Sequence, residues 1–346
     1  MRACASVGRG GHAAADAAAR VVYACRTEAA ELFDAVPEQI VFTMNATHGL
    51  NIALRSLVRP GGRVVLSGME HNAVTRPLAA LGAQIETAGA PPFAPERLLE
   101  GFARALRQGA AAAVCTHVSN VYGNVLPVSA IAALCRERGV PLIIDASQSA
   151  GTLPVSLSGT GAAFIAMPGH KGLYGPQGTG LLLCGAAGEP LLLGGTGSNS
   201  LDQSMPDFLP DRLEAGTHNV PGVAGLLEGL RFLRRRGIHS LFCHEAALVR
   251  QAAEGLAQLP RVQVYSAGEK GCQSGVLSFR VAGRDPGWVA EELGQRGIAV
   301  RAGLHCAPLA HATGGTEATG TVRVSFSAFN TGQEVERFLK TMRRLG

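Results

Sequence analysis

Short apolar runs alternate with longer segments of helical character through the first half of the chain. The runs at residues 40–43, 63–67, 111–117, 140–144, 162–167 and 181–184 predict strands, and the middle ones are apolar enough to be buried on both faces. Alanine- and leucine-rich segments predict helices at residues 13–33, 50–58 and 128–138. Strands separated by helices at this rhythm imply βαβ crossovers and a mostly parallel sheet.

The second half of the chain has a different organisation. Residues 223–259 predict a long helical region, which leads to strands at residues 262–266, 276–281 and 322–327 and helices at residues 286–296 and 333–345. We therefore expect a large domain over residues 1–222 and a bridging helix with a small C-terminal domain over residues 223–346. The chain contains no tandem repeat and no low-complexity linker.

The segment from Asp145 to Gly180 carries the clearest chemistry. Asp145 ends the apolar run 140–144, and the run 162–167 delivers His170 and Lys171 into a glycine-rich turn. Open α/β sheets bind ligands at the carboxyl ends of their strands, so these side chains are expected at one edge. A carboxylate that holds a proton on a pyridine nitrogen and a lysine that forms an imine are the groups that pyridoxal phosphate (PLP) requires.

Lysine is scarce in this chain, which strengthens the interpretation of Lys171. The 31 lysines and arginines include only three lysines, at positions 171, 270 and 340. Arginine stays protonated and cannot form an imine, so an amine at this turn suggests a chemical need. A capping aspartate and a solvated lysine would be the ordinary explanation of either residue alone. The two strand-end motifs together favour a PLP site.

These motifs resemble a known family. Asp145-x-x-Gln148 followed by Gly169-His170-Lys171-x-x-Tyr174-Gly175-Pro176 is similar to the signature of the class V aminotransferase superfamily, in its cysteine desulfurase branch. The resemblance runs from about Gly8 to the C-terminus. It implies an α/β fold of PLP-dependent transferase fold type I: a mostly parallel seven-stranded sheet flanked by helices, plus a small α+β C-terminal domain. It also implies a Schiff base between PLP and Lys171.

The resemblance assigns further residues to the cofactor. A strand that runs into a helix N-terminus at Asn45 is an anion site in its own right, although many helices begin with such a cap. The family pattern makes this turn the phosphate cradle and places a histidine over the ring. The implied cofactor residues are Ala46, Thr47, His71, Asn120, Asp145, Gln148, His170, Lys171 and Thr217. Thr217 belongs to a piece that reaches the other subunit's PLP in relatives, which implies a homodimer with shared active sites.

A second motif, Arg301-Ala302-Gly303-Leu304-His305-Cys306-Ala307-Pro308-Leu309, resembles the catalytic-cysteine loop of group II cysteine desulfurases. Nearby arginine and histidine favour an ionised, reactive thiol, whereas the other cysteines are expected to be structural. The implied reaction converts L-cysteine to L-alanine and leaves a persulfide on Cys306 for an acceptor such as another protein. Lys171, Cys306 and His71 are the expected catalytic residues. Asn120, Arg301 and Arg323 are the expected substrate-binding residues.

Composition excludes several other functions. The net charge of +5 comes from dispersed arginines without interleaved aromatics, so nucleic-acid binding has little support. No apolar run approaches membrane-spanning length, and residues 1–20 lack the apolar core of a secretory signal. The eight cysteines show no CxxC spacing, so we expect reduced thiols in the cytoplasm and no metal site.

Two departures from the family pattern leave alternatives open. Pro168 stands where relatives carry a serine or threonine that bonds the PLP phosphate, and the chain begins after the segment that carries an Asn-Ala-Ala motif in relatives. The start could lie upstream, or part of the pocket could be absent. A selenocysteine lyase, another class V activity such as transamination or β-elimination, and a weakly active or inactive PLP-fold scaffold or regulator are the alternatives.

Overall fold

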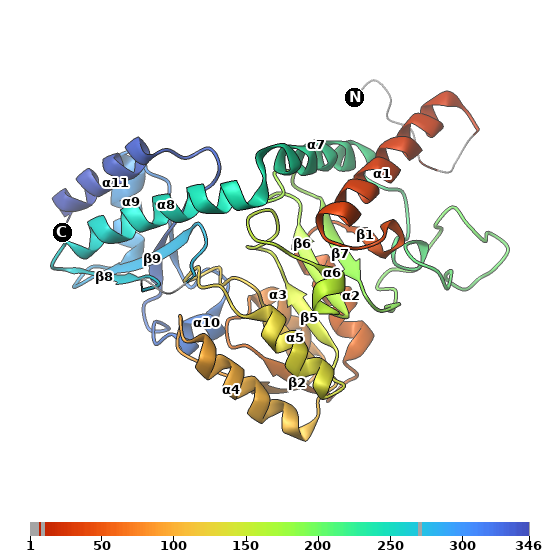
Figure 1. The fold of residues 1–346 in the computed structure, drawn as a ribbon, viewed down its shortest axis with the longest axis horizontal. Coiled ribbons are helices and arrows are strands. Elements are labelled where there is room, and N and C mark those ends of the chain that lie inside the picture. Colours follow the sequence, from red (N-terminus) through yellow and green to blue (C-terminus); the bar gives the residue numbers. More distant parts are fainter. Residues whose placement is uncertain (1–6, 8–10, 269–271, 346) are drawn as a thin grey trace.

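The first half of the chain forms a central seven-stranded sheet (Figure 1). The computed structural model describes residues 7, 11–268 and 272–345. The strands are β1 (Ile40–Thr43), β2 (Arg63–Leu66), β3 (Gln84–Thr87), β4 (Ala112–Thr116), β5 (Leu142–Asp145), β6 (Phe164–Pro168) and β7 (Gly180–Cys184). Their order is β1-β7-β6-β5-β4-β2-β3; both pairs that include β7 are antiparallel, and the other four pairs are parallel.

Helices cover both faces of this sheet. They are α1 (Ala13–Leu32), α2 (Ala46–Leu57), α3 (Asn72–Ala80), α4 (Pro95–Ala105), α5 (Val128–Glu137), α6 (Leu157–Thr160) and α7 (Val220–Arg236). One apolar cluster joins the sheet to α2 and α3, and a larger one joins it to α1, α4, α5 and α7. Every residue of β4, β5, β6 and β7 is buried, which explains why these strands have continuous apolar sequences.

The C-terminal part has its own sheet and core. Its strands are β8 (Val262–Tyr265), β9 (Val276–Val281), β10 (Arg301–Gly303) and β11 (Thr321–Ser325), all antiparallel in the order β10-β11-β9-β8. Its helices are α8 (Ile238–Ala257), α9 (Pro286–Gln295), α10 (Pro308–Thr313) and α11 (Gly332–Leu345). In Figure 1, α8 leads from α7 to this second sheet. The domain boundary after residue 222 stays a prediction.

Two helix boundaries differ from the sequence prediction. The region 223–259 is two helices, because the chain turns at Gly237, whose φ of 80° suits glycine. The helix expected from residue 50 begins at Ala46, with Asn45 as its N-cap. Short 3-10 helices lie at η1 (Pro37–Gln39), η2 (Leu106–Gln108) and η3 (Asp211–Leu213). Across the described ranges, no helix is both long and apolar enough to cross a membrane.

Candidate active site

A cavity of about 340 Å³ opens at the carboxyl ends of β4, β5 and β6. This is the edge at which open α/β sheets bind their ligands. The cavity brings together most of the residues predicted from the sequence. Its lining includes Ala46, Thr47, His71, Asn120, Asp145, Gln148, His170, Lys171 and Arg301.

Asp145 is the last residue of β5 and is almost fully buried. One carboxylate oxygen, Oδ1, accepts a hydrogen bond of 2.9 Å from the backbone N–H of Ser147. The other oxygen makes no hydrogen bond to any described residue, and the side chain lines the cavity. Asp145 therefore presents a fixed acceptor with one free oxygen to whatever occupies the site.

Lys171 follows β6 on a turn that depends on close backbone packing. A Cβ added at Gly169 would lie 2.1 Å from the hydroxyl of Thr179, and one at Gly172 would lie 2.3 Å from the carbonyl of Ala150. Only glycine permits both approaches. The Lys171 side chain is exposed to solvent at the cavity, although nearby protein atoms desolvate its amine in part. This desolvation lowers its pKa, Asp145 opposes the shift, and the positive charges of nearby arginines add to it.

The first turn of α2 faces the same cavity. Asn45 accepts a hydrogen bond of 3.0 Å from the backbone N–H of His48, which completes the helix cap. The N–H groups of Ala46 and Thr47 have no intrahelical acceptor and lie at the positive end of the helix dipole. The Thr47 hydroxyl makes no hydrogen bond within the described residues. These groups form a site suited to a phosphate.

His71 caps α3 with its side chain. Its Nδ1 accepts a hydrogen bond of 3.0 Å from the backbone N–H of Ala73, so Nε2 carries the ring proton. Burial lowers the pKa of His71, Asp145 opposes this shift, and Lys171 adds to it. The imidazole is therefore neutral near pH 7. A neutral ring can lie against a cofactor ring and donate through Nε2.

Cys306 lies at the rim of the cavity, although it is not part of the lining. The Arg301 guanidinium lines the cavity and donates to Cys306 Sγ at 3.3 Å. The backbone N–H of Asn72 donates to the Cys306 carbonyl at 2.8 Å, which places the cysteine beside the start of α3. The thiol is exposed and can be reached from solvent.

Arg323 lies behind Asn120 and is not part of the lining. Its guanidinium donates to the Asn120 backbone carbonyl at 2.8 Å, and its Nε has no partner in the part of the chain that is described. Its charge is close enough to lower the pKa of Lys171. The carboxylate-binding role predicted for Arg323 stays a prediction.

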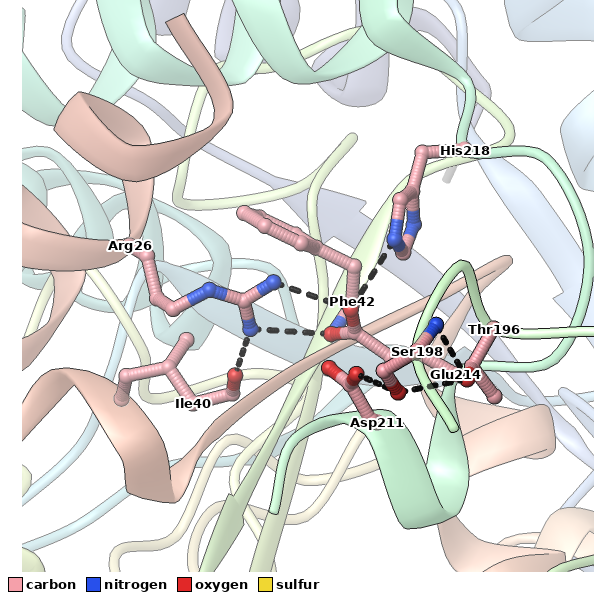
Figure 2. A network of polar contacts seen from close by, with 8 residues as sticks. All are labelled: Arg26, Ile40, Phe42, Thr196, Ser198, Asp211, Glu214 and His218. Carbon is pink, nitrogen blue, oxygen red and sulfur yellow. Dashed lines mark hydrogen bonds and ion pairs between the residues drawn. The ribbon is translucent and has the colours of Figure 1, made fainter. Parts of the chain in front are cut away.

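Thr217 lies outside this cavity, on an exposed segment between η3 and α7. A buried network holds the segment (Figure 2): Arg26 of α1 pairs with both carboxylate oxygens of Glu214 at 2.9 Å. Glu214 also accepts from the backbone N–H of Phe42 at 2.6 Å and contacts His218 Nε2 at 3.2 Å. Thr217 is therefore separate from the Lys171 cavity of its own chain and lines other hollows beside this network. Its role at a shared site stays a prediction.

Sequence reasoning missed part of the site. Thr116 and Ser147 line the cavity, and the Thr116 hydroxyl is buried without a partner among the described residues. Their positions at or just after strand ends were the available signal. The Arg26–Glu214 pair joins residues 188 positions apart, and no local pattern indicates it. Within the described ranges, no group of three or more His, Cys, Asp or Glu side chains could hold a metal ion.

The residues present fit PLP. A buried carboxylate with a free oxygen, an amine of lowered pKa and a helix N-terminus with free N–H groups surround one cavity. The buried Thr116 hydroxyl and the Asn120 side-chain oxygen add hydrogen-bonding capacity that no protein group uses in the described residues. This fold and this donor set define the class of protein as an α/β enzyme built around a PLP-type cofactor.

Comparisons with known proteins identify the family. The model of the class V aminotransferase family matches residues 1–338. A probable cysteine desulfurase of Methanothermobacter thermautotrophicus is 32% identical, over 99% of this chain and 88% of the relative. One of Mycolicibacterium paratuberculosis is 33% identical, over 89% of this chain but only 46% of the relative. The apo structure of a cysteine desulfurase from Thermococcus onnurineus superimposes with a TM-score of 0.90 at 32% identity, covering 100% of this chain and 88% of that one.

The chain therefore belongs to the class V aminotransferase family and, within it, to the cysteine desulfurases. The family, the fold type and the enzyme class predicted from the sequence are confirmed. The seven-stranded, mostly parallel sheet predicted for the large part is also confirmed. Membership of this family implies PLP as the cofactor.

Proposed function

We propose that this protein is a PLP-dependent cysteine desulfurase that converts L-cysteine to L-alanine and holds the sulfur as a persulfide on Cys306. One observation carries the proposal: Arg301 lines the Lys171 cavity and also contacts the Cys306 thiol at 3.3 Å. The amine and the thiol are thus neighbours of a single substrate site. Relatives that match most of this chain are named cysteine desulfurases, which supports the same conclusion.

PLP bound at Lys171 would serve as a sink for the electron pair released at the substrate Cα. Asp145 would hold a proton on the ring nitrogen through its free oxygen, and the first turn of α2 would hold the phosphate. Gln148 and His170 face the same cavity and suit the phenolic oxygen. The free Lys171 amine would be available as a base for the substrate Cα proton, because desolvation by the surrounding protein lowers its pKa.

Cys306 performs the sulfur step. Its thiolate attacks the substrate sulfur, an S–S bond forms, and the Cβ–S bond breaks with its electron pair left on the substrate carbon. That carbon takes up a proton, Lys171 returns a proton to Cα, and alanine leaves. The Arg301 guanidinium donates to Sγ and so directs the attacking sulfur toward the cavity that Arg301 lines. Asn120 lines the cavity, and Arg323 donates to the Asn120 backbone carbonyl. Both suit the substrate carboxylate, since a guanidinium can bind a carboxylate with two parallel hydrogen bonds.

We further propose a homodimer in which Thr217 of each subunit serves the PLP phosphate of the other. Thr217 is exposed, its neighbour His218 pairs with the buried Glu214, and it does not line the Lys171 cavity of its own chain. The exposed Cys306 persulfide would be open to an acceptor, such as a protein thiol.

The proposal is tested with three purified proteins: wild type, Lys171→Ala and Cys306→Ala. With L-cysteine we expect alanine from wild type only. Cys306→Ala should keep the visible absorbance of bound PLP, and Lys171→Ala should lose it. Full turnover by Cys306→Ala would point to transamination or another elimination, and an unchanged spectrum for Lys171→Ala would refute the cofactor assignment. Parallel assays with selenocysteine distinguish a selenocysteine lyase.

A further inference from the structure

The backbone around Cys306 has a conformation that needs support. His305 and Cys306 have consecutive φ values of 51° and 58°, in the left-handed region that residues other than glycine rarely adopt. Such residues persist when surrounding contacts hold them in place, and they concentrate at functional sites. The segment that presents the thiol is therefore held by specific interactions.

Two carbonyls of this turn are bound to the large part of the molecule. The Asn120 side-chain amide donates to the His305 carbonyl at 2.8 Å, and the Asn72 N–H donates to the Cys306 carbonyl at 2.8 Å. With both carbonyls held, the direction of the Cys306 side chain toward Arg301 is restricted. These contacts fix one side of the turn.

The His305 side chain fixes the other side. It is 2% exposed and lies 3.0 Å, through Nε2, from the hydroxyl of Thr321 on β11. Thr321 donates to the hydroxyl of Ser278 on β9 at 3.2 Å, and Ser278 donates to the Val121 carbonyl. A chain of hydrogen bonds therefore runs from His305 through the second sheet to the residue next to Asn120.

The acceptor at the end of this chain determines the direction of every hydrogen bond in it. A carbonyl can only accept, so the single Ser278 proton is used there. Thr321 must then donate to Ser278, and His305 must donate to Thr321 through Nε2–H. His305 Nδ1 consequently carries no proton, and it is buried without a partner among the described residues. Burial, together with nearby positive groups that include Arg323, lowers the pKa of His305 to about 3, so the ring stays neutral.

We propose that His305 is a positioning residue for Cys306. Its carbonyl is bound to Asn120 and its Nε2–H is bound, through Thr321 and Ser278, to Val121, so both ends of the residue connect to one short segment. This closed set of contacts holds the left-handed turn and directs Sγ to Arg301. The inference rests on the proposed role of Cys306.

Two amide substitutions test the proposal. The amide nitrogen of His305→Gln reaches as far as Nε2 and can donate to Thr321, whereas that of His305→Asn reaches only as far as Nδ1. We expect His305→Gln to stay near wild type. We expect His305→Asn to form the Cys306 persulfide about tenfold more slowly in a single turnover, because a displaced nucleophile reacts poorly. PLP absorbance and thermal unfolding are measured for each variant to confirm a folded, loaded protein.

Alkylation with iodoacetamide gives a readout that does not depend on turnover. Peptide mapping compares Cys306 with Cys243, an exposed thiol on α8 that serves as an internal reference. His305→Asn should slow Cys306 relative to Cys243, because the turn that presents Sγ to solvent beside Arg301 is no longer held in place. Thr321→Val removes the hydroxyl that accepts the hydrogen bond from His305 Nε2–H. It should slow the alkylation of Cys306 relative to Cys243 in the same way.

Three results would overturn the inference: a wild-type alkylation ratio in His305→Asn, an unaffected Thr321→Val, or equal impairment of His305→Gln and His305→Asn. Failure of the proposed function gives a different outcome. In that case wild type forms no persulfide, while the alkylation ratios still follow the order of the variants.

Discussion

Replacement of Glu214 by glutamine should destabilise the protein far more than loss of an ordinary ion pair. The side chains of Arg26 and Glu214 are only 9% and 3% exposed, and the carboxylate also accepts from the Phe42 backbone (Figure 2). Glutamine has nearly the same shape as glutamate but leaves the Arg26 charge uncompensated. Its amide N–H also has to face Arg26 or the Phe42 N–H, which are both donors. Breaking a buried pair in this way costs about 3–5 kcal/mol.

Glu31→Gln is the matched control for Glu214→Gln. Glu31 is on α1 and forms an ion pair with Arg234, but the side chains of Glu31 and Arg234 are 52% and 59% exposed. A pair that exposed contributes about 0–1 kcal/mol. Both substitutions remove one carboxylate from one arginine, but Arg234 is exposed and keeps a second partner, Glu28, whereas Arg26 is left buried with its charge uncompensated.

Urea unfolding followed by far-ultraviolet circular dichroism is the suitable assay. The single tryptophan, Trp288, is on α9 and would report on the C-terminal part alone. We expect the midpoint of Glu214→Gln to fall by an amount on the order of 1 M, with little change for Glu31→Gln. Because Glu214 holds the Thr217 segment, PLP affinity should fall as well. Equal midpoints for the two variants would refute the reasoning.

Three further predictions follow from the site and the core. Pro168→Ser should bind PLP about tenfold more tightly, because it supplies a hydroxyl to the phosphate, whereas Pro168→Ala should not; titration of the apoenzyme measures this. Arg323→Gln should raise the KM for L-cysteine and leave the PLP spectrum unchanged, and an unchanged KM would remove Arg323 as the carboxylate anchor. Burial raises the pKa of Glu245 from 4.5 to about 7. The folded state then keeps a proton that the unfolded state loses, so the contribution of Glu245 to stability falls as pH rises from about 4.5 to 7. Glu245→Gln should therefore gain up to about 3 kcal/mol over wild type at pH 8 and almost nothing at pH 4.5, with exposed Glu254→Gln unchanged at both.

The sequence predicted the strands best where the chain is buried on both sides. Continuous apolar runs predicted the strands β4 to β7, and the motifs at the ends of these runs predicted most of the residues that line the cavity. The edge strand β3 was missed because its sequence, Gln84–Thr87, is polar and mostly exposed. A strand of this kind forms because its neighbour β2 pairs with it, and its own pattern carries no such information.

Long-range contacts were beyond sequence reasoning for a physical reason. Arg26 and Glu214 are indistinguishable from solvated charges until the fold buries both of them. From the sequence, His305 was expected to favour the ionised thiol of Cys306. Its side chain is instead hydrogen bonded to Thr321 on β11. In both cases the chemistry of the residue was visible in the chain, but its partner was not.

The most direct test of the central claim is mass spectrometry of the peptide that contains Cys306, after the PLP-loaded protein reacts once with L-cysteine and is trapped with an alkylating agent. The account predicts one added sulfur on Cys306 in wild type, with an equal amount of alanine formed, and no added sulfur in Lys171→Ala. Formation of alanine without sulfur on Cys306, or sulfur on Cys306 in the absence of Lys171, would contradict it.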